Sequence, residues 1–229
     1  MPRQKKKTKI DFGDEDAVLV DVAKALLDAD SEDMSIEEDR GMSGFGEGTV
    51  YRIEWEGEEY HVAENYDQAY ALAVAVVKQD LEQEPEIFDK DFIESHINTD
   101  KLRDELMSDV IDHRIDDLTE MAENEKEDFW EEWKREGLKL PKEEREPTQN
   151  EIEELAQKQA ETELEDPMQY LEDSVGREDA GKEAIRIAGI DINAAADDAV
   201  DTDGWEHFLA RYDGHSHETA SGLVYWRVN

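Results

Sequence analysis

A row of acidic residues in the middle of the chain is the feature best placed to do chemistry. The segment "DELMSDVIDHRIDDL" (104–118) has helical periodicity, and on a helix its acids and those that follow share one stripe. The stripe, which we call the acidic row, consists of Glu105, Asp109, Asp112, Asp116, Glu120, Glu123 and Glu127. Like charges at these spacings disfavour a helix by roughly 0.2–0.5 kcal/mol per pair, a cost that solubility does not require. The row is therefore our candidate partner-binding surface.

The whole chain shares this acidity. Its 229 residues include 64 Asp and Glu against 25 Lys and Arg, which gives a formal net charge of −39. Small soluble domains commonly carry a net charge of magnitude ~2–8, and larger self-repulsion opposes compaction unless salt or a basic partner relieves it. At the charge density of duplex DNA, one per ~1.7 Å, 39 charges would imitate about 66 Å of DNA. The charge suffices for mimicry of nucleic acid, although charge runs are usually solvated helix faces.

Possible metal ligands gather near the C-terminus: His207, His215 and His217, with Asp201, Asp203 and Asp213 nearby. Their spacing matches no zinc pattern. A calcium loop with Gly204 in sixth place would put Ala199 first and Ala210 twelfth, neither of which has a carboxylate. We therefore predict no metal and no cofactor, while binding by the three histidines stays open.

Motifs of catalysis and membrane insertion are missing from the sequence. There is no cysteine, no P-loop, no G-x-G-x-x-G after a strand and no G-x-S-x-G. Carboxylate pairs occur everywhere, so none marks a catalytic acid and base. The longest apolar run, residues 69–77, is about half of what a bilayer crossing needs. No apolar segment follows the basic start "MPRQKKKTK". We predict a soluble intracellular protein that is not an enzyme and has no membrane partner.

The segment 50–62, "VYRIEWEGEEYHV", is typical of a β-hairpin with Glu56-Gly57 as its turn. The predicted cross-strand pairs are Ile53 with Tyr60 and Tyr51 with Val62, which share one face with Trp55. Asn65, followed three residues later by Gln68, is a helix N-cap before the apolar residues 69–77. A hairpin and a buried helix predict a compact α+β nucleus.

From Phe88 the chain is predicted to be mostly helical. The apolar stripe of the acidic helix comprises Leu102, Leu106, Val110, Ile111, Ile115 and Leu118. Phe129, Trp130 and Trp133 are expected to be core anchors, because they are not surrounded by basic residues as base stacking would require. Thr148 to Glu151 predicts a capping box that opens a helix from about 149 to 165.

The two ends of the chain are less regular. Residues 17–27 predict a short amphipathic helix, whereas 28–48 are typical of a flexible linker and 1–9 of a basic tag. Near the C-terminus, 207–212 and 223–229 are predicted to pair as strands, in a second small unit or in the first sheet. The prediction is therefore an α+β protein with four regions: a flexible 1–48, the hairpin-helix nucleus 49–97, an acidic helical region 98–175 and an α+β unit 176–229.

The C-terminal segment "GWEHFLARYDGHSHE", followed by "VYWRVN", resembles the tail of an uncharacterised group of bacteriophage proteins. The matching positions are Gly204, His207, Leu209, Tyr212, Asp213, Gly214, Glu218, Tyr225, Arg227 and Asn229. The hairpin and helix from Tyr51 also look like the front of such proteins, so the resemblance covers about 90 residues, with 98–175 as an insertion. It implies a phage-encoded protein in the host cytoplasm, without an established activity.

These observations support three functional hypotheses. The leading one is an acidic interaction protein of a phage, which inhibits a basic host nucleic-acid-binding or defence protein by DNA mimicry and does not bind nucleic acid itself. The second is a viral structural or assembly protein, or a salt-adapted protein in which acid serves hydration. The third is a metal-dependent activity at His207 to His217. The identity of the partner and the oligomeric state stay open.

Overall fold

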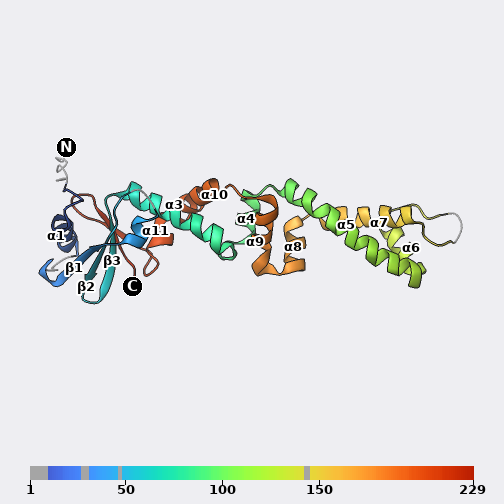
Figure 1. Ribbon diagram of the computed structural model, residues 1–229, viewed down its shortest axis with the longest axis horizontal. Helices are drawn as coiled ribbons and strands as arrows, with labels where there is room; N and C mark the ends of the chain where they lie inside the picture. The colour runs from blue at the N-terminus through green and yellow to red at the C-terminus, as the bar shows by residue number, and fades with distance from the viewer. Residues whose placement is uncertain (1–9, 27–30, 46–47, 142–144) are drawn as a thin grey trace, which may run out of the picture. The chain divides into compact units, whose positions relative to one another are not determined.

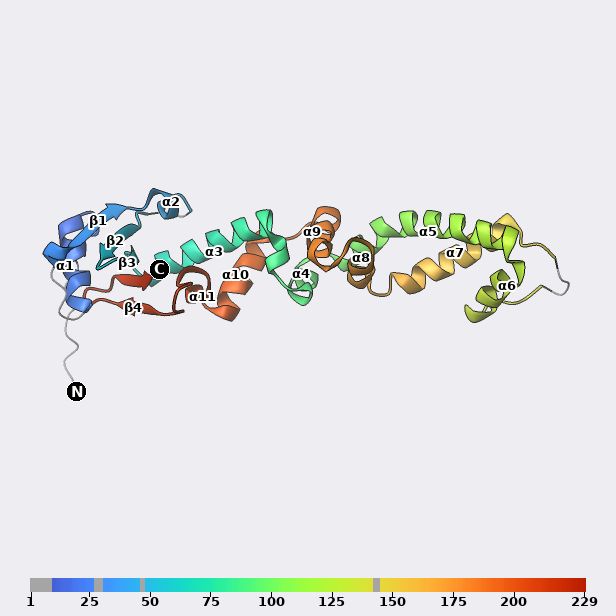
Figure 2. The ribbon, with the colours of Figure 1, turned by 90° about the horizontal axis from the view of Figure 1, so that it is seen from below.

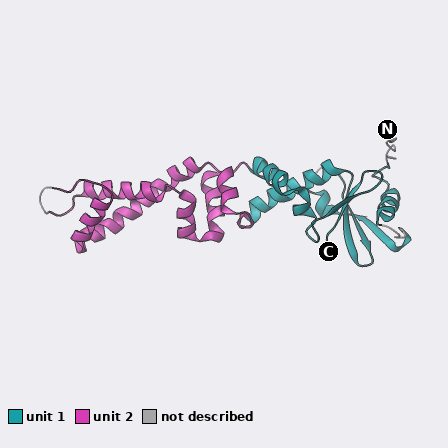
Figure 3. Ribbon diagram, turned by 180° about the vertical axis from the view of Figure 1, so that it is seen from behind, with its two compact units in different colours: residues 1–84, 192–229 teal, residues 85–191 magenta. Residues whose placement is uncertain are grey.

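The computed structural model describes residues 10–26, 31–45, 48–141 and 145–229 (Figure 1). Within these residues the chain forms eleven α-helices and one five-stranded antiparallel sheet, which confirms the α+β class. Two compact units divide the chain (Figure 3): unit 1 comprises residues 1–84 and 192–229, and unit 2 comprises residues 85–191. These units differ from the four predicted regions, because the C-terminal segment joins the sheet of the N-terminal one.

The sheet of unit 1 has the strand order β1-β2-β3-β5-β4. The strands are β1 (Met34–Glu38), β2 (Tyr51–Trp55), β3 (Glu58–Ala63), β4 (Ser216–Glu218) and β5 (Val224–Arg227). The hairpin β2–β3 has the predicted register, with Ile53 opposite Tyr60 and Tyr51 opposite Val62. Its turn residues Glu56 (φ 51°) and Gly57 (φ 84°) are both left-handed, which matches the right-handed twist of the strands.

Helices cover both faces of this sheet. Helix α1 (Glu15–Ala25) packs Val18 and Val22 on one face, against a core that includes Ile53 and Tyr225. The next residue of β5, Trp226, points to the opposite face. There its ring lies 5.4 Å from that of Trp205 in α11 (Trp205–Leu209).

The long helix α3 (Tyr66–Gln83) packs against α10 (Ile192–Asp203) and α11, so residues far apart in sequence complete unit 1. Asn65 caps α3 as predicted, because its side chain accepts a hydrogen bond from the Gln68 N–H at 2.9 Å. The predicted burial within 69–77 is also confirmed, with Ala69, Leu72 and Val77 in the core.

The linker prediction for 28–48 was wrong where the structure describes it. Residues 34–38 form the edge strand β1, and Arg40–Ser43 form the short helix α2; residues 28–30 and 46–47, like the basic tag 1–9, lie outside the described residues. Met34 and Ile36 pack against the sheet core, while Glu37 and Glu38 are exposed. Charges on an edge strand discourage pairing with other chains, but in sequence they are typical of a linker.

The strand prediction for 207–212 was also wrong. Residues 205–209 form α11, because Trp205 and Leu209 are both buried at a helical spacing of four. The prediction for 223–229 was correct in type, since β5 lies there. It pairs with β3 and β4, so the chain returns to the first sheet.

Unit 2 is helical in its described residues. After a 3₁₀ turn at Pro85–Ile87, its helices are α4 (Lys90–His96), α5 (Thr99–Asn124), α6 (Lys126–Arg135), α7 (Gln149–Glu163), α8 (Pro167–Val175) and α9 (Arg177–Ala188). Helices α5 and α7 lie side by side (Figure 2). Phe129 and Trp133 of α6 pack with Leu118 of α5 and Leu155 of α7, as expected for core anchors. The predicted capping box at Thr148 and Glu151 is present.

The predicted acidic helix is present, but it ends before the last residue of the acidic row. Helix α5 stops at Asn124, Glu125 has an extended φ of −138°, and α6 starts at Lys126. In one straight helix Phe129 would lie about 16 Å along the axis from Leu118, too far to share a core cluster. The break lets α6 pack back on α5, and it separates Glu127 from the other row residues.

Candidate functional site

All seven residues of the acidic row are exposed to solvent. Six of them, from Glu105 to Glu123, lie on α5 and extend over about 27 Å of its axis. The seventh, Glu127, lies in the first turn of α6, where its charge favours the helix dipole. The predicted row is thus brought together for six residues, at about one charge per 5 Å.

The row carboxylates lack partners within the part of the chain that the structure describes. None of the seven accepts a side-chain hydrogen bond or forms an ion pair there, and none contacts a cation of its own helix. The last turn of α5 has no basic residue, so Glu120 and Glu123 also oppose the negative end of the helix dipole. No described cation therefore neutralises the row, and repulsion within it raises the free energy of the folded state.

Two cations near the start of α5 are directed to neighbouring helix ends instead. Arg103 donates to the carbonyl oxygens of Leu164 and Glu165, just after α7, at 2.6 and 3.0 Å. Lys101 donates to the Ala188 carbonyl at the end of α9, at 3.1 Å. Positive side chains at these carbonyls complete the last helical turns and favour the helix dipoles. These two cations connect α5 to the ends of α7 and α9, and they leave the row unneutralised.

Other acids near the row are partly neutralised. Arg114 forms an ion pair with Glu163 of α7, and its second nitrogen lies 3.5 Å from Asp117. His113 lies 3.7 Å from the same carboxylate. Asp117 is therefore a weaker candidate for partner binding than the row residues, although both kinds look alike in sequence.

The histidines considered as metal ligands are not gathered into a cluster in the described part of the chain. His207, His215 and His217 are exposed, and no group of three or more His, Asp or Glu residues with metal-binding geometry occurs among the described residues. His217 instead packs its ring 5.2 Å from that of Tyr225. None of the described helices has both the length and the apolar character that a bilayer crossing needs.

Residues of the C-terminal tail make structural contacts within unit 1. Arg227 forms an ion pair with Glu58 at 2.7 Å, and its guanidinium lies 4.0 Å from the ring centre of Tyr212. The Asp213 side chain accepts the His215 N–H at 3.0 Å, a bond that is typical of Asp in a turn. These contacts explain several residues of the tail pattern without assigning them a function.

A buried polar group on the sheet was missed by the sequence reasoning. His61 is only 8% exposed, and its Nε2 atom lies 3.0 Å from Asp39 and 3.6 Å from Glu59. Arg52, its cross-strand neighbour, forms an ion pair with Glu37. Burial lowers the pKa of His61, and Asp39 and Glu59 act in the opposite direction. The hairpin register was the signal that would have placed Arg52 beside His61.

No family model, no curated protein and no solved structure matches the chain.

Proposed function

We propose that the acidic row binds the nucleic-acid-binding surface of a basic protein and so excludes nucleic acid from it. The carrying observation is that six exposed carboxylates follow one helix without a partner among the described residues, while Lys101 and Arg103 of that helix bond carbonyl groups and Arg114 bonds Glu163. Five adjacent like-charge pairs on α5 cost about 1–2.5 kcal/mol. A basic partner would recover that cost in the complex.

The partner is a host nucleic-acid-binding or defence protein, and the chain acts as an anti-defence inhibitor encoded by a bacteriophage. The phage context rests on the resemblance of the C-terminal tail, from Gly204 to Asn229. Direct binding to nucleic acid is disfavoured, because both surfaces carry negative charge. The proposed place of action is accordingly the host cytoplasm.

Charge reversal in the row tests the proposal. In the row variant, Asp109, Asp112 and Asp116 are each replaced by Lys. The side chains are exposed and Lys has a higher helix propensity than Asp, so the fold is retained. The control variant carries Glu82→Lys, Asp197→Lys and Asp203→Lys in unit 1, which are exposed and make the same change in net charge.

The measurement is displacement of labelled duplex DNA from a bacterial protein that the parent chain captures. The parent and the control displace the DNA, whereas the row variant loses at least tenfold in apparent affinity. Salt weakens the complex, though less steeply than it weakens DNA binding, because the row carries about one charge per 5 Å against one per ~1.7 Å in the duplex. Equal displacement by the row variant contradicts the proposal, and equal loss in both variants assigns the effect to net charge alone.

A folding titration separates this proposal from salt adaptation. A mimic is folded at low ionic strength, where its target binds best. A salt-adapted chain, which uses its acids for hydration, would show helical circular dichroism only at molar salt. That result would remove the need for a basic partner to account for the row.

A further inference from the structure

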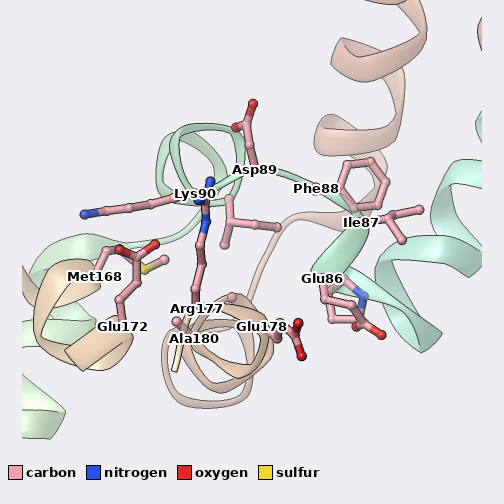
Figure 4. A pocket seen from close by; sticks show the side chains of 13 residues that line it. Glu86, Ile87, Phe88, Asp89, Lys90, Met168, Glu172, Arg177, Glu178 and Ala180 are labelled. Carbon is pink, nitrogen blue, oxygen red and sulfur yellow. The ribbon is translucent and has the colours of Figure 1, made fainter. Parts of the chain in front are cut away.

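A pocket of about 280 Å³ lies within unit 2, away from any motif of the sequence (Figure 4). Its apolar wall includes Ile93, Met168 and Ala180, which come from α4, α8 and α9 and are at most 2% exposed. Ile87, at the rim, is 57% exposed. The volume is near the lower end of the ~300–1,000 Å³ of ligand pockets, which suits a small metabolite.

Arg177 lines this pocket and has no hydrogen-bond or ion-pair partner for its side chain among the described residues. Figure 4 shows its side chain extending from α9 toward the start of α4, with Glu172 on one side and Glu178 on the other. Among the described arginines, only Arg177 and Arg40 have neither a hydrogen bond nor an ion pair through the side chain. Lys90, by contrast, is bound to Asp166 at 3.2 Å. An unpaired arginine is unusual in a chain with so many carboxylates.

The start of α9 adds to the positive side of the pocket. Its N-cap is Gly176, which has no side chain to accept the first N–H groups. The N–H groups of Asp179 and Ala180 bond to the Gly176 carbonyl, so those of Arg177 and Glu178 stay available to an anion. The helix end alone is not a site, but here it opens beside the arginine and the apolar wall.

Acidic residues line the same pocket. Figure 4 shows Glu86 and Glu178 on one side of Arg177. A bare anion would meet these carboxylates, and a bare cation would meet the guanidinium, so each is disfavoured by like charge. A zwitterion satisfies both sides at once.

We propose that this pocket binds a free α-amino acid with an apolar side chain. Arg177 holds the carboxylate in a bidentate pair, and Glu86 and Glu178 hold the ammonium group. The side chain packs on the exposed Ile87, beside the buried Ile93 and Met168, so an apolar amino acid is favoured over a polar one. Multiply charged anions such as nucleotides are excluded by the carboxylates. This inference stands independently of the function proposed for the acidic row.

The test uses the full chain with labelled Ile and Met methyl groups, followed by NMR during titration with L-leucine. Saturable shifts are expected for Ile87, Ile93 and Met168. The analogue without the ammonium group, 4-methylpentanoate, and the analogue without the carboxylate, 3-methylbutylamine, bind at least tenfold more weakly. Glycine shifts none of these methyl groups. The absence of a saturable shift with leucine, or equal binding of the two analogues and leucine, overturns the proposal.

Two variants on α9 sharpen this result. Arg177→Gln lowers the leucine affinity at least tenfold and Arg177→Lys restores part of it, because the guanidinium is exposed and holds nothing else in place. Lys182→Gln makes the same charge change on the same helix, at an exposed side chain without a partner, and leaves binding unchanged. Equal losses in Arg177→Gln and Lys182→Gln would show a general charge effect and reject the assigned role of Arg177.

Discussion

Arg52 in unit 1 and Arg103 in unit 2 are both half-buried cations, but they have different partners. Arg52 lies among carboxylates, in an ion pair with Glu37 and 3.9 Å from Glu59. Arg103 contacts only carbonyl oxygens, at the end of α7. Unit 1 therefore uses this cation to neutralise acid, whereas unit 2 uses its cation to complete a helix end.

The difference matters because the two units have similar charge. Unit 1 has 29 acidic and 11 basic residues, and unit 2 has 35 and 14. Net charge therefore does not distinguish them as interaction surfaces. What distinguishes unit 2 is that Lys101 and Arg103 of α5 are bonded to backbone carbonyls and Arg114 to Glu163, which leaves an ordered row of carboxylates exposed on a helix.

The largest predicted effect distinguishes the buried core of unit 1 from that of unit 2. Phe129→Ala removes a fully buried ring that stacks on Trp133 in unit 2, and it lowers the free energy of unfolding of that unit by about 3–5 kcal/mol. Hydrogen exchange should accelerate in α5 and α7 and not in β2 and β3, because each unit has its own buried cluster. The counterpart Ile53→Ala, also fully buried, should show the reverse pattern. Uniform acceleration would mean that the units unfold as one.

The second prediction uses the buried histidine of unit 1. The pKa of His61 is lowered by burial and by Arg52, against the opposing charges of Asp39 and Glu59. Its pKa in the folded state thus lies below the unfolded value of about 6.5, so the unfolded chain takes up the proton first as pH falls. The free energy of unfolding of unit 1 should therefore decrease as the pH is lowered from about 6.5. For this one group the decrease is at most about 1.4 kcal/mol per pH unit.

The measurement compares the parent with His61→Gln by denaturant unfolding between pH 7.5 and 5.5. Protonation of the carboxylates relieves repulsion in both proteins, so the difference between them isolates the histidine. His207→Gln, an exposed histidine of the same unit, serves as the control and should follow the parent. Parallel curves for the parent and His61→Gln would contradict the prediction.

Local signals explain which parts of the fold could be predicted. The Glu56-Gly57 turn set the hairpin register, Asn65 marked the start of α3, and Thr148 with Glu151 marked the start of α7. Each of these features depends on residues within a few positions of one another. The exposure of the acidic row was predictable for the same reason, since helical periodicity sets it.

Contacts between distant residues explain the failures. Strand β1 forms because Met34 and Ile36 pack on a core built by β2, β3 and β5. No local pattern near residues 34–38 predicts the pairing with β2. The end of α5 at Asn124 depends on burial of Phe129 against α7. The pocket with Arg177 joins segments that lie at least 75 residues apart, so sequence periodicity had no means of finding it.

The smallest effect tests the stability cost of the row. Asp112→Lys turns two repulsive pairs, with Asp109 and Asp116, into attractive ones, and it should raise the free energy of unfolding of unit 2 by about 0.8–2 kcal/mol at low ionic strength. The gain should shrink in molar salt, because exposed charges are screened within about 3 Å there. Asp112→Asn removes repulsion without adding attraction, so about half of the gain is expected.

A matched change in unit 1 completes the comparison. Glu54→Lys is exposed too, but it removes a carboxylate that lies 3.8 Å from Arg52, so it should not stabilise unit 1. Thermal unfolding of the three variants at low and high salt gives the answer. Stabilisation by Glu54→Lys as large as that by Asp112→Lys would mean that relief of net charge explains both, and that the ordered row of unit 2 carries no special cost. A gain confined to Asp112→Lys and Asp112→Asn would place the strain on α5, where a basic partner could relieve it by binding.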